Sequence, residues 1–278
     1  MESHKFDAME GTRFQNVVWV PEIPSTNTSL LELARNGGQE GEVLIADLQT
    51  QGRGRRGRVW TAPPGTSLMM SILLRPPSHS LPVRSASLVT SALAVATINA
   101  VSEATKVELG IKWPNDLVVD SPNDAPGDLG YLKVAGILTE TLIVDGEISA
   151  LVVGMGLNTG WERVPPELEL VATSLDLLAG SLIDRPKLAR TILHNFENEY
   201  SDLLQPSGIE TLLEKMRRHS STVGRRVRVH LDQSKGTPTL EGRAVDLNET
   251  GQLVIQTDHG DRQTVSVADV EHLRLDAR

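Results

Sequence analysis

Residues 42–60 read EVLIADLQTQGRGRRGRVW, an apolar run followed by a loop crowded with arginine and glycine. The first eight residues, Glu42–Gln49, are typical of a buried strand. Between Gly52 and Arg58, four arginines alternate with three glycines. Glycine lets a backbone approach a ligand closely, and the forked donors of arginine match phosphate and carboxylate oxygens. At the end of a buried strand this composition favours an anion site, while an RNA contact and a solvated basic loop stay open as alternatives.

The chain as a whole is acidic and contains no cysteine. Its 278 residues carry a formal net charge of -9, with 39% hydrophobic and 23% charged residues. This composition predicts a packed core and argues against nucleic-acid binding over the whole surface. The absence of cysteine excludes disulfides, a cysteine nucleophile and thiolate metal sites. Because the N-terminus MESHKFDAME has no apolar run and no stretch reaches the ~18 consecutive apolar residues of a spanning helix, we expect a soluble cytoplasmic protein.

A strand and a capped helix are predicted upstream of the opening stretch. Val17–Val20 reads as a short strand. PSTNTSLLELARNGG, residues 24–38, reads as a helix in which Thr26 or Asn27 caps the first turn and Gly37 ends the last. The apolar positions expected to share one face of this helix are Leu30, Leu33 and Ala34.

Downstream, the pattern predicts alternating strands and helices and then a change of architecture. The expected elements are a strand in residues 66–76, a helix over Ser85–Lys106, a strand–turn–strand over residues 111–120, a polar loop over Ser121–Gly130, three strands over residues 131–158 and helices over Pro186–Leu204 and Ser207–Arg217. Asp145-Gly146 suits a hairpin turn. After residue 220, short alternating strands with turns at Asn248–Gly251 and Asp258–Gly260 predict a small β-barrel. We therefore predict two domains, 1–220 and 221–278.

Three further positions carry candidate chemistry. Lys112 precedes a turn that holds Asn115 and Asp116, a set that can hold a triphosphate and its Mg²⁺, although an ordinary turn has the same composition. Lys133 is a single cation in the strand-like run YLKVAGIL. A lysine there costs stability unless its ammonium meets an anion or reaches solvent. Asn158 follows the glycines of GMGLN and can read a base edge or simply form a turn.

Taken together, these segments resemble the biotin protein ligases. The residues that carry the resemblance are PSTN (Pro24–Asn27), QTQGRGRRGRVW (Gln49–Trp60), KWPNDL (Lys112–Leu117), KVAGILTE (Lys133–Glu140) and GMGLN (Gly154–Asn158). The resemblance runs from about Val17 to the C-terminus. It implies an α+β fold, with a mixed-sheet catalytic domain like that of class II aminoacyl-tRNA synthetases and a small C-terminal SH3-like β-barrel.

The resemblance also implies a reaction in two steps. The biotin carboxylate attacks the α-phosphorus of ATP, with Mg²⁺, to give biotinyl-5′-adenylate and pyrophosphate. A lysine of a biotin carboxyl carrier domain then takes the biotinyl group and releases AMP. The enzyme forms no covalent intermediate, which agrees with the missing cysteine.

Residue roles follow from the same resemblance. Lys133 and Arg53 are expected to be catalytic, and Asp116 to contact Mg²⁺. The residues expected to bind biotin are Ser25, Thr26, Asn27, Gln49, Gly52, Arg53, Gly54, Arg55, Lys133 and Gly136. The residues expected to bind ATP or the adenylate are Arg53, Arg55, Arg56, Arg58, Trp60, Lys112, Asn115, Asp116 and Asn158. Trp60 is expected to pack over the ordered loop.

The sequence departs from the family pattern at two places. The STN segment begins at Ser25, so we expect the short form, without an N-terminal helix-turn-helix and without operator-DNA binding. The loop Ser121–Gly130 lengthens the turn before Lys133, and its role is open. Two alternative functions remain: a lipoate-type ligase of the same fold, and an RNA-binding module built on the Arg/Gly loop. Whether the protein is a monomer or a homodimer is also open.

Overall fold

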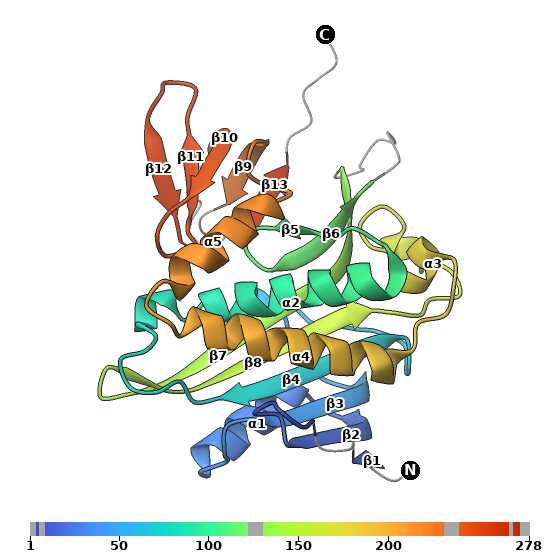
Figure 1. Cartoon of the computed structure of the whole chain (residues 1–278). Helices are drawn as coiled ribbons and strands as arrows, with labels where there is room; N and C mark the ends of the chain where they lie inside the picture. Colours follow the sequence, from blue (N-terminus) through green and yellow to red (C-terminus); the bar gives the residue numbers. More distant parts are fainter. Residues whose placement is uncertain (1–3, 6–8, 122–129, 231–238, 267–268, 273–278) are drawn as a thin grey trace.

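The computed structural model describes residues 4–5, 9–121, 130–230, 239–266 and 269–272. An eight-stranded mixed sheet and a five-stranded antiparallel sheet organise the chain, with helices packed on the larger sheet (Figure 1). The predicted α+β class, with a small C-terminal β-sheet unit, is confirmed. The predicted domain boundary at residue 220 falls between the last helix and the first strand of the small sheet.

The strands of the large sheet follow the order β1-β2-β3-β4-β8-β7-β6-β5. Their bounds are β1 (His4–Lys5), β2 (Asn16–Ile23), β3 (Glu42–Gln49), β4 (Ser67–Leu74), β5 (Gly110–Lys112), β6 (Asp116–Asp120), β7 (Tyr131–Val144) and β8 (Glu147–Asn158). β2 and β3 pair in parallel, and the other neighbouring strands described in this sheet pair antiparallel. The central pairs bring the ends of β3, β7 and β8 to one region of the sheet, where the pocket lies.

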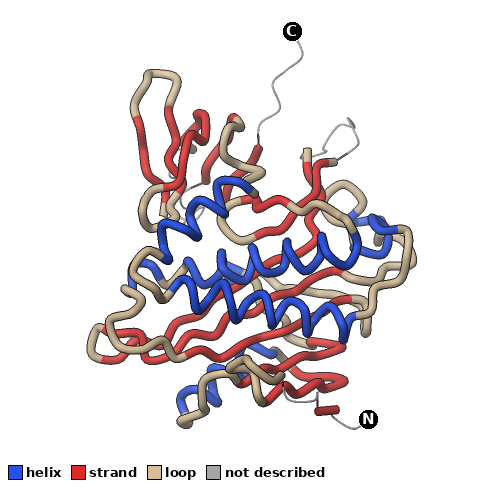
Figure 2. Tube along the Cα trace, viewed as in Figure 1, coloured by secondary structure: helices blue, strands red, loops and turns tan. Residues whose placement is uncertain are grey.

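Five α-helices, the small sheet and three short 3-10 helices, η1 (Arg55–Gly57), η2 (Val83–Ser85) and η3 (Pro166–Leu168), complete the described elements. The helices are α1 (Thr26–Arg35), α2 (Leu88–Thr105), α3 (Leu175–Ala179), α4 (Arg185–Leu203) and α5 (Gly208–Arg218). The small sheet has the order β12-β11-β10-β9-β13 and is built from β9 (Arg226–His230), β10 (Leu240–Leu247), β11 (Leu253–Gln256), β12 (Arg262–Val265) and β13 (Asp269–His272). The tube view separates the helical layer from the sheet that it covers (Figure 2).

Helices cover the two faces of the large sheet unequally. Ile72 and Leu74 of β4 pack into the main core together with α2 and α4. Leu73, between them, belongs to a smaller cluster with Leu30 and Leu31 of α1. Because successive side chains of a strand point to opposite faces, α1 lies on the face opposite α2 and α4. The α1 face is the one that carries the pocket.

The helix α2 is apolar on all sides because it lies between the sheet and α4. Among the described residues, the segment Val83–Thr105 has the length and composition to cross a membrane, but 78% of its apolar window is buried inside the protein. Its side chains join the core built by α4 and the large sheet. The segment is therefore the central helix of this domain.

Several local predictions need correction. Residues 131–158 form two long strands, β7 and β8, where we predicted three, although the turn at Asp145-Gly146 is confirmed. The N-cap of α1 is Ser25, whose hydroxyl accepts from the Thr28 N–H; Thr26 and Asn27 are already helical. Leu33 is exposed, and Leu31 takes its place in the cluster under α1. Most of the loop Ser121–Gly130 lies outside the described residues.

The small sheet is joined to the large one through the short edge strand β5. The Ile111 N–H donates to the His219 carbonyl at 2.7 Å, and the Ser221 N–H donates to the Ile111 carbonyl at 2.9 Å. The chain that leaves α5 therefore pairs in parallel with β5 before it enters β9. This pairing ties the small sheet to the segment that leads into Asn115 and Asp116.

Candidate functional site

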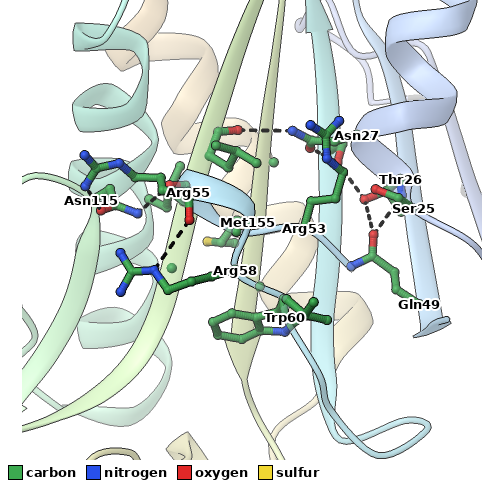
Figure 3. A pocket seen from close by; sticks show the side chains of 18 of the residues that line it. Ser25, Thr26, Asn27, Gln49, Arg53, Arg55, Arg58, Trp60, Asn115 and Met155 are labelled. Carbon is green, nitrogen blue, oxygen red and sulfur yellow. Dashed lines mark hydrogen bonds between the residues drawn. The ribbon is translucent and has the colours of Figure 1, made fainter. Parts of the chain in front are cut away.

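A pocket on the α1 face of the large sheet gathers most of the side chains singled out in the sequence (Figure 3). It is covered by the Arg/Gly loop, which we define as Gly52–Trp60. The residues that line it are Ser25, Thr26, Asn27, Gln49, Arg53, Gly54, Arg55, Arg58, Val59, Trp60, Ser71, Asn115, Asp116, Lys133, Gly136, Ile137, Leu138, Gly154, Met155 and Gly156.

One end of the pocket is neutral and closely hydrogen-bonded. We call it the neutral end and define it by Thr26, Asn27, Gln49 and Ser71. The backbone N–H and the hydroxyl of Thr26 donate to Gln49 Oε1 at 2.7 and 3.0 Å. Ser71 Oγ lies 2.6 Å from both Thr26 Oγ1 and Asn27 Oδ1. Thr26, Asn27 and Ser71 are buried, so these contacts replace those with water and fix the shape of this end.

Glycines form the floor of the pocket because neighbouring side chains occupy the space above them. A Cβ atom on Gly154 would lie 1.8 Å from Asn27 Oδ1, and one on Gly156 would lie 2.3 Å from the Trp60 ring. On Gly136, which pairs with Gly156 across β7 and β8, it would lie 2.9 Å from Lys133 Nζ. The glycines of β7 and β8 are therefore required for close approach across the sheet surface.

The Arg/Gly loop folds into a short hairpin over the sheet. The Trp60 N–H donates to the Gly52 carbonyl at 3.0 Å, and the Gly54 N–H donates to the Arg58 carbonyl at 2.7 Å. The tip turns at Arg56 and Gly57, which have φ of 55° and 74°. The hairpin directs Arg53 toward the Asn27 side of the pocket and Arg55 toward Asn115 (Figure 3).

The opposite end of the pocket is charged. We call it the charged end and define it by Arg53, Arg55, Asp116 and Lys133. Lys133 Nζ lies 2.7 Å from Asp116 Oδ1, and Arg55 Nη1 donates to Asn115 Oδ1 at 2.9 Å. The ammonium of Lys133 is also 5.4 Å from the Trp60 ring centroid. Of the two outcomes left open for this strand lysine, both are observed: its ammonium pairs with Asp116, and its side chain is 31% exposed.

The Asn115–Asp116 turn is anchored to the sheet as well as to the loop. The Asn115 side-chain amide donates to the Ile137 carbonyl at 2.8 Å, and the Ile137 N–H donates to the Asn115 carbonyl at 3.0 Å. Asn115 therefore links the Arg/Gly loop to β7, the strand that carries Lys133.

Sequence reasoning assigned no role to Glu140 or Ser71. Glu140 Oε1 lies 3.0 Å from Arg53 Nη1, and its other oxygen accepts from the Asn27 amide at 3.0 Å. This carboxylate therefore connects the charged end to the neutral end. Ser71 lay within a segment read only as a strand. Glu140 ended the segment Lys133–Glu140 that carries the family resemblance, but no role was given to it. Contacts with residues far away along the chain bring both side chains to this region.

Most of the predicted site residues come together, and four do not line the pocket. Gly52 closes the base of the loop, since a Cβ there would meet the Trp60 carbonyl oxygen at 2.3 Å. Arg56 lies at the exposed tip. Lys112 is buried with its ammonium 4.9 Å from the Tyr131 ring centroid. The Asn158 amide donates to the Thr173 carbonyl at 3.1 Å within the core.

The charge of the pocket is opposite to that of the chain. Four cationic side chains line it, Arg53, Arg55, Arg58 and Lys133, against the single carboxylate of Asp116. Among the described residues, no group of three or more histidine and acidic side chains gathers to hold a metal ion. The pocket is thus suited to an anion with a neutral polar group beyond it, and a metal ion would have to draw most of its ligands from that anion.

Comparison with known proteins first gives the class. Residues 19–158 match the model of the biotin/lipoate A/B protein ligase family. Residues 222–273 match the model of the biotin protein ligase C-terminal domain. This match covers all the described strands of the small sheet. The chain is therefore of the ligase class whose members attach biotin or lipoate.

Individual relatives narrow the class. The chain is 33% identical to the biotin–[acetyl-CoA-carboxylase] ligase of Mycobacterium tuberculosis, over 95% of this chain and 91% of that protein. It is 31% identical to the bifunctional ligase/repressor BirA of Bacillus subtilis, over 92% of this chain and 74% of that protein. The solved biotin protein ligase from Aquifex aeolicus, in complex with biotin and ATP, superposes with a TM-score of 0.73 at 26% identity and covers 94% of this chain and 100% of that one. The chain belongs to the biotin protein ligase family.

Proposed function

We propose that this chain condenses biotin with ATP to biotinyl-5′-adenylate and pyrophosphate, and then transfers the biotinyl group to a lysine of a biotin carboxyl carrier domain. The observation that carries this proposal is a single pocket with a buried neutral end and a cationic end over a glycine floor. A ligand that fits has a neutral polar head and an anionic tail. Biotin has that shape, and its adenylate extends the anionic part.

The neutral end is suited to the ureido ring of biotin. Its hydroxyl and amide groups are buried and held by one another, so they present fixed donors and acceptors to a neutral polar ligand. A site of this kind discriminates against a ligand whose atoms do not match the donors and acceptors that it holds in fixed positions. Lipoate, whose ring carries no amide, is rejected on this basis.

The charged end is suited to the carboxylate and the α-phosphate. Two anions must meet for the adenylate to form, and Lys133, Arg53 and Arg55 reduce their repulsion. During attack of the carboxylate oxygen on phosphorus, negative charge grows on the phosphoryl oxygens. Cations already held in place stabilise that charge more in the transition state than in the ground state. Lys133 and Arg53 act on the reacting atoms, while Arg55, Arg56 and Arg58 support the nucleotide phosphates.

The donor set at the charged end fits Mg²⁺ bound mainly through ATP. Mg²⁺ in nucleotide sites is held by one or two carboxylates together with phosphate oxygens and water, and Asp116 supplies one carboxylate at the pocket wall. When bound, the ion neutralises phosphate charge and orients the triphosphate. Lys112 and Asn158 do not line the pocket. We therefore propose that they act on the nucleotide without direct contact, through the residues that surround it.

The Arg/Gly loop protects the product of the first step. An acyl-adenylate hydrolyses in water, and a loop that closes on the sheet excludes water from it. In the second step the amine of a carrier lysine attacks the carbonyl carbon, AMP leaves, and charge on the carbonyl oxygen falls within reach of the cations of the charged end. We place this reaction in the cytoplasm with a carrier domain of a biotin-dependent carboxylase as partner.

The test is pyrophosphate release from ATP with biotin, lipoate or octanoate as the acid. We expect pyrophosphate release with biotin and not with lipoate or octanoate. Biotin should then be transferred to a purified carrier domain. Equal turnover with lipoate would contradict the assignment and favour the lipoate-type alternative. Salt-sensitive RNA binding without any nucleotide turnover would favour the RNA-binding alternative.

A further inference from the structure

The small C-terminal sheet meets the large sheet directly behind the charged end of the pocket. Its contacts centre on Trp113, which is separated from the Asn115–Asp116 turn by Pro114. The indole N–H of Trp113 donates to the Gly251 carbonyl at 3.0 Å, in the turn between β10 and β11. Trp113 is 4% exposed, so this contact is inside the protein.

A second contact holds the backbone of the same residue. The Trp113 N–H donates to Thr222 Oγ1 at 3.0 Å, and the same hydroxyl oxygen lies 3.0 Å from His272 Nε2. Thr222 is fully buried and His272 is 8% exposed. A buried backbone N–H needs a partner, and here a side chain from the C-terminal segment supplies it. Loss of that hydroxyl leaves the N–H unsatisfied unless the backbone moves.

His272 also touches the strand that carries Lys133. Its ring meets Tyr131 edge to face, with centroids 5.1 Å apart and planes at 68°. Tyr131 lies two residues before Lys133 on β7, and Trp113 lies three residues before Asp116. The Thr222–His272 pair therefore contacts β7, the strand that carries Lys133, and the turn that leads into β6, the strand that begins at Asp116.

We infer that Thr222 is a positioning residue for adenylate formation, and that with His272 it makes the C-terminal sheet a brace for the Asn115–Asp116 turn. The inference rests on the proposed function, since it assigns the brace to the cationic end that acts on ATP. Asn115 holds Arg55, and Asp116 holds Lys133, so a displaced turn moves two cations at once. A displacement near 1 Å is enough to lower a rate about 10²-fold when reacting groups depend on it.

The inference predicts a loss of rate with little loss of biotin binding. The neutral end contacts neither Thr222 nor Trp113, so the contacts proposed for the ureido ring of biotin do not depend on the brace. Thr222→Val keeps the side-chain shape and removes the hydroxyl. We expect it to lower kcat for biotin-dependent pyrophosphate release at least about 10-fold and to leave the biotin KM within about twofold.

Two further variants make the comparison specific. Thr222→Ser restores the hydroxyl, and we expect a kcat within about threefold of the unaltered protein. Thr264→Val makes the same chemical change at an exposed position of β12 and serves as the matched control. Both should leave the Asn115–Asp116 turn in place. Each rate is taken per folded molecule, at a temperature well below the unfolding midpoint.

Amide hydrogen exchange gives a readout that does not require activity. Peptides that cover Ile111–Leu117 should exchange faster in Thr222→Val than in Thr222→Ser, because the Trp113 N–H loses its acceptor. Should Thr222→Val fail to fold, His272→Phe takes its place, since it keeps a ring against Tyr131 and removes the partner of Thr222. We expect a reduced kcat and faster exchange over the same peptides.

The outcomes separate the inference from the proposed function. A folded Thr222→Val, or His272→Phe in its place, with unaltered kcat and unaltered exchange overturns the brace. A natural-sequence protein that releases no pyrophosphate with biotin overturns the proposed function, whereas the exchange comparison still tests whether Thr222 holds the turn. Loss of rate in Thr222→Val that Thr222→Ser does not recover also overturns the role of the hydroxyl.

Discussion

The neutral end and the charged end lie in one pocket, above the glycines of β7 and β8, but are stabilised differently. At the neutral end, Thr26, Asn27 and Ser71 are at most 5% exposed and hydrogen-bond to one another or to Gln49. At the charged end, the side chains of Arg53, Lys133 and Asp116 are 49%, 31% and 22% exposed and form ion pairs. Buried neutral bonds fix a shape, whereas partly exposed ion pairs exchange readily with an incoming anion.

This difference suggests a division of work within one pocket. On the proposed function, the neutral end would bind the ligand without rearrangement. At the charged end, Glu140 and Asp116 hold Arg53 and Lys133 in place. Asp116 and Glu140 occupy the places near Lys133 and Arg53 that ligand oxygens would take. Variants that affect one end and leave the other intact should therefore separate binding from catalysis.

Lys133→Ala should have the largest effect, because it removes a cation from the reacting atoms. We expect the rate of biotin-dependent pyrophosphate release to fall about 10²–10³-fold, with thermal unfolding little changed, since the ion pair with Asp116 is partly exposed. Lys215→Ala is the control, because Lys215 pairs with Glu199 between α5 and α4. A near-normal rate in Lys133→Ala would remove Lys133 from the chemistry.

Gly154→Ala should damage the neutral end instead. The added Cβ would lie 1.8 Å from Asn27 Oδ1, and Asn27 cannot move aside freely because Ser71 and Glu140 hold it. We expect the dissociation constant for biotin, measured by calorimetry, to rise about 10–100-fold. Gly160→Ala is the matched control, since the nearest atom to its added Cβ is 4.0 Å away. Unchanged affinity would show that the ligand does not use this end.

Glu140→Gln should have a smaller effect, at a residue that contacts both ends of the pocket. The variant keeps an acceptor for the Asn27 amide and removes the charge that holds Arg53. With less competition for Arg53, we expect the KM for ATP to decrease about two- to fivefold, in line with an exposed ion pair worth up to about 1 kcal/mol. Glu147→Gln, at the exposed β7–β8 turn, is the control. An increased ATP KM would mean that Glu140 orients Arg53 for catalysis.

The last prediction concerns the pH dependence of the folding stability, through His272 behind the charged end. Burial, and then the nearby Lys112 and Arg225, lower the pKa of His272 to about 3. The unfolded chain takes up this proton near pH 6.5 and the folded chain does not, so the contribution of His272 is complete above pH 6.5. It decreases as the pH falls toward 3, by up to about 1.4 kcal/mol per pH unit.

Unfolding by urea at a series of pH values measures this contribution. His272→Phe should show a shallower fall of unfolding free energy between pH 6.5 and the acid limit of reversible unfolding. Thr264→Val, which changes no ionisable group, should keep the original slope. Parallel slopes for the natural sequence and His272→Phe would mean that His272 is not held neutral in the folded protein.

The sequence was most informative where local chemistry and tertiary structure agree. The strand Glu42–Gln49 is observed with the predicted bounds, because its apolar residues and the glycine-rich loop after it mark both ends. The grouping of Arg53, Asn115 and Lys133 in one pocket was implied by the family resemblance and is observed. The roles given to these residues remain proposals.

The predictions that the structure corrects, and the residues that received none, have physical explanations. Glycines at 136, 154 and 156 are turn residues by propensity, yet here they lie inside long strands because Trp60, Lys133 and Asn27 approach the backbone closely. These glycines therefore explain why three strands were predicted over residues 131–158, where the structure has two. Glu140 and Ser71 carry no local signal, since their neighbours in the pocket are more than 40 residues away along the chain or belong to other strands. The position of Asn158, turned into the core, follows from pairing with β4 that no short motif encodes.

Trp60 has a further consequence for how the Arg/Gly loop can be observed. Its ring lies against the backbone of Gly156, and its indole Nε1 is buried without a hydrogen-bond partner among the described residues. The chain has four tryptophans, and the other three, Trp19, Trp113 and Trp161, are at most 8% exposed. An indole that leaves such a surface for water emits at longer wavelength. Opening of the Arg/Gly loop should therefore shift the emission of Trp60 to longer wavelength. The rate of opening can then be measured by tryptophan fluorescence, without an added label.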